Sequence, residues 1–151
     1  MPSRRRSREC ALQMIYQWDA GGGDPDQVVA DFFGRLAADD PQPVDAFAEQ
    51  LFRDAANNVA ELDAIIARHS AERWQPSRIE PVVRHLLRLA LAELRGGETP
   101  PAIVINETLE IGKRYDGDAS TRFMNGILNG FVEASDPDDV ESGQSGPQNE
   151  R

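Results

Sequence analysis

Four arginines, Arg4, Arg5, Arg6 and Arg8, stand within the first eight residues of a chain whose formal net charge is −10. A basic cluster in an acidic protein creates a localised positive field, which attracts a polyanion to one end of the molecule. Guanidinium groups can clamp phosphates, and an aromatic ring beside them can stack on a base. With Tyr16, these arginines therefore predict a minimal site for single-stranded RNA. The same cluster also fits a disordered, solubilising basic leader.

An apolar helical pattern follows the arginines directly and predicts a docked helix that carries them. Its apolar residues recur at i, i+3, i+4 and i+7: Ala11, Met14, Ile15 and Trp18. On this helix Arg5, Glu9, Leu12 and Tyr16 share one flank, so the Tyr16 ring lies beside the basic run.

The rest of the chain also has helical spacing, and no stretch alternates long enough to predict a strand. The pattern predicts helix boundaries at turn-forming and capping residues: Asp24-Pro25, Pro41 and Pro43, Asn57-Asn58, Gly96-Gly97, Pro100-Pro101, Asp116-Gly117-Asp118 and Ser120. One core-facing stripe predicted in this way comprises Ala48, Phe52, Ala55, Val59, Leu62 and Ile66. We therefore expect an all-α fold of about six or seven helices.

Length and composition predict one globular domain, residues 1–132, with a core of its own. Residues 133–151 hold six carboxylates and one arginine, a net charge of −5, and no aromatic residue, so we expect a disordered acidic tail. No apolar run approaches the roughly 20 residues of a membrane span, and the arginine-rich N-terminal residues lack the apolar stretch that is typical of a secretory signal. The single cysteine, Cys10, fits a reducing cytoplasm and is predicted to be a small apolar filler.

Several other polar patterns leave alternatives open. Arg84, Arg88 and Arg95 form a stripe on one predicted helix, which could contact RNA, a protein partner or neighbours such as Glu80. Another face combines Asn106, Glu110, Lys113 and Arg114, and an intrahelical Glu110–Arg114 pair would leave it a solvated surface. Asn125 and Asn129 could pair with a backbone or a base, or face water. Gly126 and Gly130, four residues apart, would let another backbone or a ligand approach closely.

The sequence shows no motif that is typical of catalysis or of cofactor binding. His69 and His85 have no cysteine or acidic companions at metal-ligand spacing. No nucleophile elbow, phosphate loop or dinucleotide fingerprint occurs. We therefore expect a protein that is not an enzyme and that uses no metal or cofactor.

Three segments together resemble one family. RRRSRECALQMIYQWD (residues 4–19), RIEPVVRHLLRLALAELR (78–95) and PAIVINETLEIGKRYDGDASTRFMNGIL (101–128) occur in the order and spacing of the NusB family of bacterial transcription antitermination factors. The opening arginines, the triplet Ile105-Asn106-Glu107 and the run from Phe123 to Leu128 are jointly specific. The resemblance covers roughly residues 4–132.

The resemblance implies an all-helical fold of two small packed subdomains. It implies binding of single-stranded boxA-type RNA in ribosomal RNA leader transcripts together with the ribosomal protein NusE, in a complex that helps RNA polymerase read through terminators. The implied RNA contacts are Arg4, Arg5, Arg6, Arg8, Tyr16, Arg122 and Phe123. Family members exist as monomers or homodimers. Many relatives carry an acid where this chain has Ala119, which affects the fine specificity of that edge of the site.

Two other functions compete with this one. Domains similar to the NusB family stand in front of RNA cytosine methyltransferases, but such an enzyme needs a cofactor-binding domain after residue 132, where only 19 residues follow. A DNA-binding helical regulator would need a helix-turn-helix with a basic recognition helix, whereas the dense basic patch of this chain is terminal.

Overall fold

The computed structural model describes residues 3–39, 45–70 and 79–134, and these ranges contain only helices and their connections. Six helical spans follow one another: α1 (Arg4–Gly21), α2 (Pro25–Asp39), α3 (Ala46–Asn57), α4 (Val59–His69), α5 (Pro81–Gly96) and α6 (Pro101–Ala134). A break at Gly117 divides α6 into two helices. The predicted all-α fold of six or seven helices is confirmed for the described residues.

Most helix boundaries lie where the sequence predicts them. Ser3 caps α1 by accepting a hydrogen bond from the Arg6 amide on its Oγ (3.1 Å). Gly97 ends α5 in the left-handed conformation (φ 75°), and its amide donates to the carbonyls of Glu93 and Leu94. At Asn58, between α3 and α4, the chain leaves the helical conformation for one residue.

The α6 break differs from the prediction in one detail. Gly117 is the residue inside this span with non-helical backbone angles (φ 76°, ψ −161°), and the helix resumes directly after it. Ser120 therefore lies inside the resumed helix, where it is buried, instead of preceding the helix as its N-cap. Glycine is required at the break because a side chain strains a positive φ.

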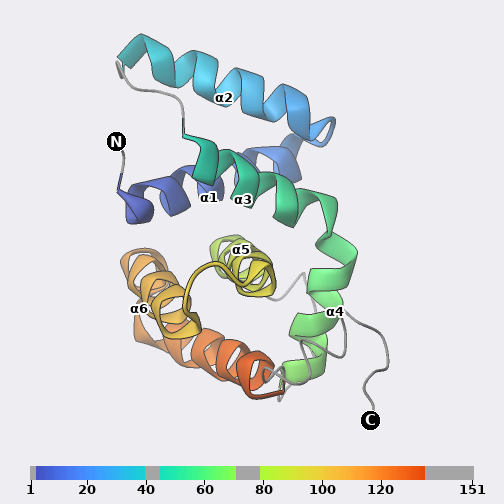
Figure 1. Cartoon of the computed structure of the whole chain (residues 1–151), viewed down its shortest axis with the longest axis vertical. Helices are drawn as coiled ribbons and strands as arrows, with labels where there is room; N and C mark the ends of the chain where they lie inside the picture. Colours follow the sequence, from blue (N-terminus) through green and yellow to red (C-terminus); the bar gives the residue numbers. More distant parts are fainter. Residues whose placement is uncertain (1–2, 40–44, 71–78, 135–151) are drawn as a thin grey trace.

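The helices form two packed groups (Figure 1). Helices α1 and α3 lie against each other with α2 on their outer side, and α4, α5 and α6 form the second group. Helix α5 lies between the groups, because it packs on α1 and α3 as well as on α4 and α6. The two small subdomains expected from the family resemblance are thus present.

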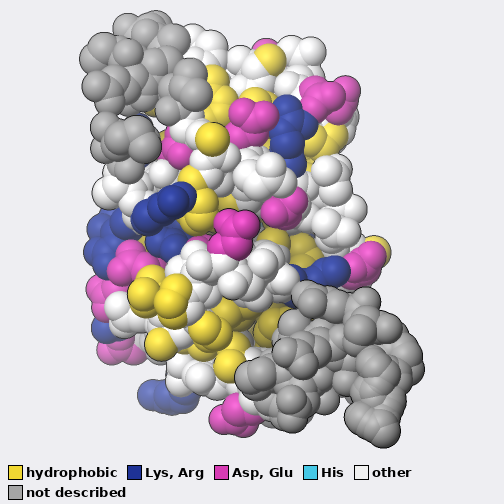
Figure 2. All heavy atoms as spheres, in the orientation of Figure 1, with side chains coloured by type: hydrophobic (Ala, Val, Ile, Leu, Met, Phe, Trp, Pro, Cys, Tyr) yellow, Lys and Arg dark blue, Asp and Glu magenta, His cyan; other side chains and the backbone are white. Residues whose placement is uncertain are grey.

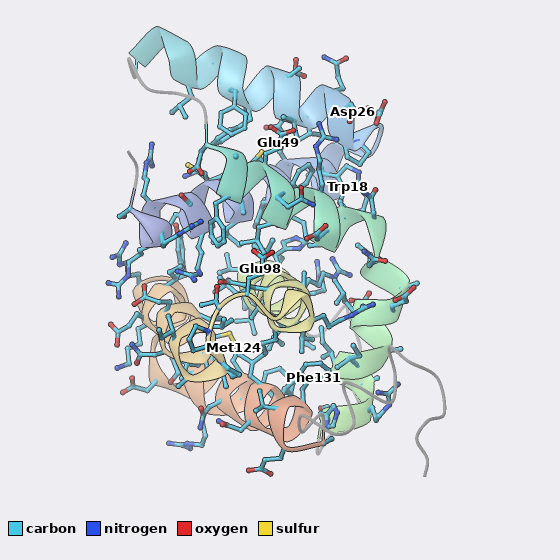
Figure 3. The ribbon with its side chains drawn as sticks, viewed as in Figure 1. Trp18, Asp26, Glu49, Glu98, Met124 and Phe131 are labelled. Carbon is cyan, nitrogen blue, oxygen red and sulfur yellow. The ribbon has the colours of Figure 1, made fainter. Side chains whose placement is uncertain are left out.

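The core runs through both groups. The predicted stripe of α3 and α4 is buried except for Val59, which is half-buried, and Cys10 is buried in α1. Met124, labelled in Figure 3, is fully buried in the half of α6 that follows the break, and its methyl group occupies the space over Gly112 in the other half. The glycine thereby lets the two halves of α6 pack closely.

Residues 135–151, which include nearly all of the predicted acidic tail, lie outside the described residues. Glu133 and Ala134, the first two residues assigned to that tail, are exposed residues at the end of α6.

Candidate nucleic-acid interface

The four N-terminal arginines occupy the first two turns of α1, and the helix separates them into different environments. Arg4 and Arg6 are exposed, Arg5 is half-buried and Arg8 is buried. Within the described part of the chain, neither Arg4 nor Arg6 forms an ion pair. The Arg4 guanidinium lies 4.1 Å from the centre of the Phe47 ring, a cation–π contact with the start of α3.

Arg8 is part of the protein interior. Its Nε and Nη2 donate to the two carboxylate oxygens of Glu93 on α5, at 2.9 and 2.6 Å, and both side chains are about 6% exposed. Its guanidinium also lies 5.4 Å from the Phe47 ring centre. Arg8 thus joins α1, α3 and α5, and it has a structural partner for its charge.

Arg5 connects α1 to α6. Its Nε and Nη2 donate to Oε1 and Oε2 of Glu107 at 2.8 and 3.0 Å, and the Arg5 side chain remains 36% exposed. The hydrogen bond with Arg5 lowers the pKa of the Glu107 carboxyl, and the same bond raises the pKa of Arg5. Both groups are therefore charged at neutral pH.

A second pair joins the same two helices further along. Arg114 of α6 donates to the carboxylate of Glu9 on α1. Arg114 therefore pairs across the helices and not with Glu110, which approaches Lys113 at 3.8 Å. Figure 2 shows Lys/Arg and Asp/Glu side chains alternating at the edge of the molecule where α1 and α6 lie. This surface carries both signs of charge in alternation.

A groove of about 620 Å³ opens at the start of α1. Its walls come from α1, α3, the α5–α6 connection and α6: Ser3, Arg4, Arg5, Arg8, Phe47, Glu98, Thr99, Ile103 and Glu107. Glu98, marked in Figure 3, belongs to that connection. The Ile103 side chain is 49% exposed, so its apolar surface is open to solvent. The groove thus combines guanidinium groups with aromatic and aliphatic surface.

Tyr16 is exposed at the other end of α1. Its side chain is 45% exposed, and its ring meets the buried His85 ring edge-on at a centroid distance of 5.5 Å. Burial, and next the charge of Arg88, lowers the pKa of His85 to about 4. The imidazole is therefore neutral at pH 7, and it supports a tyrosine ring that remains open to solvent.

Arg122 and Phe123 follow the α6 break by five and six residues. Arg122 is exposed, whereas Phe123 is half-buried and packs against the core. On the same helix Asn129 donates to the Asn125 carbonyl (2.9 Å) and to its side-chain oxygen (2.7 Å), and both are exposed. A Cβ on Gly126 would meet nothing within 4 Å, whereas one on Gly130 would lie 3.2 Å from the His69 ring. The side chain of Ala119 lies outside the described residues.

The arginine stripe of α5 is occupied by contacts within the protein. Arg88 donates to both carboxylate oxygens of Asp63 at 2.7 Å, and Arg95 donates to Glu61 at 2.8 Å. Arg84 donates to the Ile79 carbonyl and lies 3.6 Å from Asp19. The sequence left RNA, a protein partner or neighbours within the chain as possible contacts of this stripe, and the structure shows contacts within the chain.

The structure thus brings Arg4, Arg5 and Arg8 together at one groove, and it adds residues that sequence reasoning left out. Phe47 and Ile103 carried only a core or helix signal in the sequence. Glu107 belonged to the family triplet, but its pairing with Arg5, 102 residues away, carried no local signal.

None of the described helices combines the length and apolar character that crossing a membrane requires. In residues 3–39, 45–70 and 79–134, no group of three or more His, Cys, Asp or Glu side chains is arranged to hold a metal ion.

Several known proteins are similar to this chain over most of its length. The chain is 40% identical over 135 residues to the transcription antitermination protein NusB of Koribacter versatilis, which covers 89% of this chain and 91% of the relative. The fold is similar to that of T. maritima NusB, with a TM-score of 0.76 and 28% identity over 93% of this chain and 98% of the other.

A second solved structure contains the antitermination factors NusB and NusE in complex with dsRNA. It matches with a TM-score of 0.72 and 25% identity, covering 87% of this chain and 96% of the other. The family model for the NusB family matches residues 5–133. This match includes three of the four N-terminal arginines and the break in α6. The chain therefore belongs to the NusB family.

Proposed function

We propose that this protein is a transcription antitermination factor that binds single-stranded, boxA-type RNA in ribosomal RNA leader transcripts. The observation that carries the proposal is the pair of exposed arginines, Arg4 and Arg6, on a docked helix beside a groove that also contains the Phe47 and Ile103 side chains. Cations held on a fixed element neutralise phosphates and supply the sequence-independent part of RNA affinity. The bases then have aromatic and aliphatic surface within reach, as single-stranded RNA requires.

The proposed RNA path begins at Arg4, Arg5 and Arg6 and follows α1 towards Tyr16. The exposed Tyr16 ring supplies a surface for a base, and Arg122 with Phe123 on α6 supplies the remaining contacts implied by the family. Arg8 lies beneath this surface and is not one of the proposed phosphate contacts, because it is buried and paired with Glu93. Its role in the proposal is to hold the start of α1 in position.

The second partner proposed here is the ribosomal protein NusE. A protein of similar fold, NusB, has been solved with NusE and dsRNA in one complex. The two proteins together would then join the RNA polymerase antitermination complex. The protein acts by binding and not by catalysis, in the cytoplasm, where nascent transcripts are made.

An electrophoretic shift assay tests the proposal. The full chain is titrated against a single-stranded RNA carrying a boxA element, a shuffled RNA of equal length, and duplex DNA of the same sequence. We expect the chain to bind the boxA strand most tightly, and we expect NusE to strengthen this binding. Equal or tighter binding to the duplex DNA would instead support a DNA-binding regulator.

A further inference from the structure

The Arg5–Glu107 pair uses only one edge of the guanidinium group. The Nε–H and one Nη2–H point to the carboxylate, at 2.8 and 3.0 Å. A guanidinium carries five N–H donors in a rigid plane, so one Nη2–H and both Nη1–H groups remain. Within the described part of the chain these three have no hydrogen-bond partner. One Nη1–H and the remaining Nη2–H form the end-on edge, which can bind two oxygens of a phosphate side by side, whereas the other Nη1–H points away from that edge.

Two opposite effects on RNA binding follow from Glu107. As a negative charge on an RNA-binding surface, it repels phosphates and competes for Arg5. As a bidentate partner, it fixes the Arg5 plane, which otherwise rotates freely on a long side chain, and so lowers the entropy lost when a phosphate binds. The geometry favours the second effect, because the carboxylate occupies the side edge and leaves the end-on edge open.

The position of the pair supports this reading. Arg5 is 36% exposed and Glu107 is 22% exposed, so the carboxylate lies deeper than the guanidinium that it holds. Both residues line the groove at the start of α1, together with the exposed Arg4 and the apolar Ile103. Arg5 is thus the more accessible of the two charged side chains in this groove.

We propose that Glu107 is a positioning residue for RNA binding: it orients Arg5 so that the free Nη1/Nη2 edge clamps one phosphodiester of the bound strand. The inference rests on the proposed function and extends it to a residue whose own charge opposes RNA. It makes a counterintuitive prediction, since removing a negative charge from the binding surface weakens the complex.

The test compares Glu107→Gln with Glu110→Gln in the full chain, using a single-stranded boxA RNA as the probe. Both variants remove one carboxylate from the same helix, but Glu110 makes no hydrogen bond to Arg5 and lies 3.8 Å from Lys113. Glu107→Gln should weaken binding about tenfold, as expected for one charge-assisted contact. Glu110→Gln should bind as tightly as the unchanged protein or slightly tighter.

The salt dependence of binding separates positioning from a purely structural role. Losing one phosphate of a single strand reduces the log–log salt slope by about 0.7. Glu107→Gln should show this reduction, and so should Arg5→Ala, which removes the guanidinium group itself. A variant that only loosens the α1–α6 contact would lower the melting temperature and leave the slope of the folded fraction unchanged.

A double-mutant cycle completes the test. In an Arg5→Ala background, Glu107→Gln should weaken binding no further, because the group it positions is gone. Tighter binding by Glu107→Gln, an unchanged slope, or a loss that persists without Arg5 would each overturn the inference while the proposed function stands. Failure of the unchanged protein to bind the RNA would instead overturn the proposed function.

Discussion

Arg8 and Glu93 form a buried, bidentate ion pair that joins the first helix to α5, with donor–acceptor distances of 2.9 and 2.6 Å. Only four residues earlier, Arg4 is exposed and rests on Phe47. One basic cluster therefore contains a structural arginine and surface arginines. The two kinds are expected to respond differently to substitution.

Arg8→Ala should destabilise the fold by about 3–5 kcal/mol, because it leaves the Glu93 carboxylate buried without its partner. Urea denaturation measures this loss. Arg6→Ala, on the exposed side of the same helix, is the matched control and should change stability by less than about 0.5 kcal/mol. Similar stabilities for the two variants would contradict the buried role of Arg8.

His85 should make stability depend on pH. Burial lowers its pKa from 6.5 to about 4, so between these values the unfolded chain binds a proton that the folded chain does not. The free energy of unfolding therefore decreases as the pH falls from about 6.5 to about 4, by up to about 3 kcal/mol. Arg84, Arg88, Asp19 and Asp63 face the same imidazole and belong to the same network.

Denaturant titrations at a series of pH values check this prediction, with His85→Gln as the control. The variant should lose most of the slope in that window. Glu107, whose pKa is also lowered, contributes in the same direction only below its usual value of 4.5, so the two effects separate. An unchanged slope in His85→Gln would assign the dependence to other groups.

Two glycines of α6 should respond to alanine in opposite ways. A Cβ at Gly126 meets nothing within 4 Å, so Gly126→Ala should stabilise the protein by up to about 1 kcal/mol through helix propensity. A Cβ at Gly112 would lie 2.4 Å from the Met124 methyl group, which is fully buried. Gly112→Ala should cost about 1–3 kcal/mol from overpacking, less the gain in propensity.

Thermal unfolding of the two variants makes the comparison. If Gly112→Ala proved as stabilising as Gly126→Ala, Met124 would have room to move, and the close approach between the halves of α6 would not need glycine.

Phe123→Ala should reduce both stability and RNA affinity. The ring is half-buried against the core, so the stability loss should be smaller than the roughly 3–5 kcal/mol typical of a fully buried phenylalanine. A stacked base contributes about 1–3 kcal/mol, so affinity should fall tenfold or more. Melting and RNA binding are measured on one preparation. Unchanged affinity of the folded fraction would leave Phe123 with a core role alone.

Much of the fold follows from local chemistry. Glycines, prolines and asparagines predict where helices end, and the apolar stripes predict which faces are buried, since both signals depend on neighbours three or four residues away. The α6 break was expected at the right turn, but the helix resumes before Ser120 because Gly117 alone provides the left-handed residue.

The candidate site was predicted less completely. Three ion pairs join residues that are 85 to 105 positions apart in the sequence: Arg5–Glu107, Arg8–Glu93 and Arg114–Glu9. Helical periodicity predicts on which face of its helix a residue lies, but it does not predict which residue of another helix that face contacts. The sequence therefore predicts that Arg8 is a surface cation like Arg4, whereas the packing of α1 on α5 buries Arg8.

In the proposed function, the exposed arginines at the start of α1 clamp phosphates of a single-stranded RNA. The salt dependence of RNA binding by the double variant Arg4→Ala/Arg6→Ala tests this role. The matched control is Arg35→Ala/Arg68→Ala, which removes two exposed arginines from α2 and α4 and leaves the same net charge.

If Arg4 and Arg6 each contact one phosphate, the log–log salt slope of the first variant should shrink by about 1.4, whereas the control should keep a slope close to that of the unchanged protein. Equal slopes for the two variants, with both well folded, would contradict RNA binding at the N-terminal arginines.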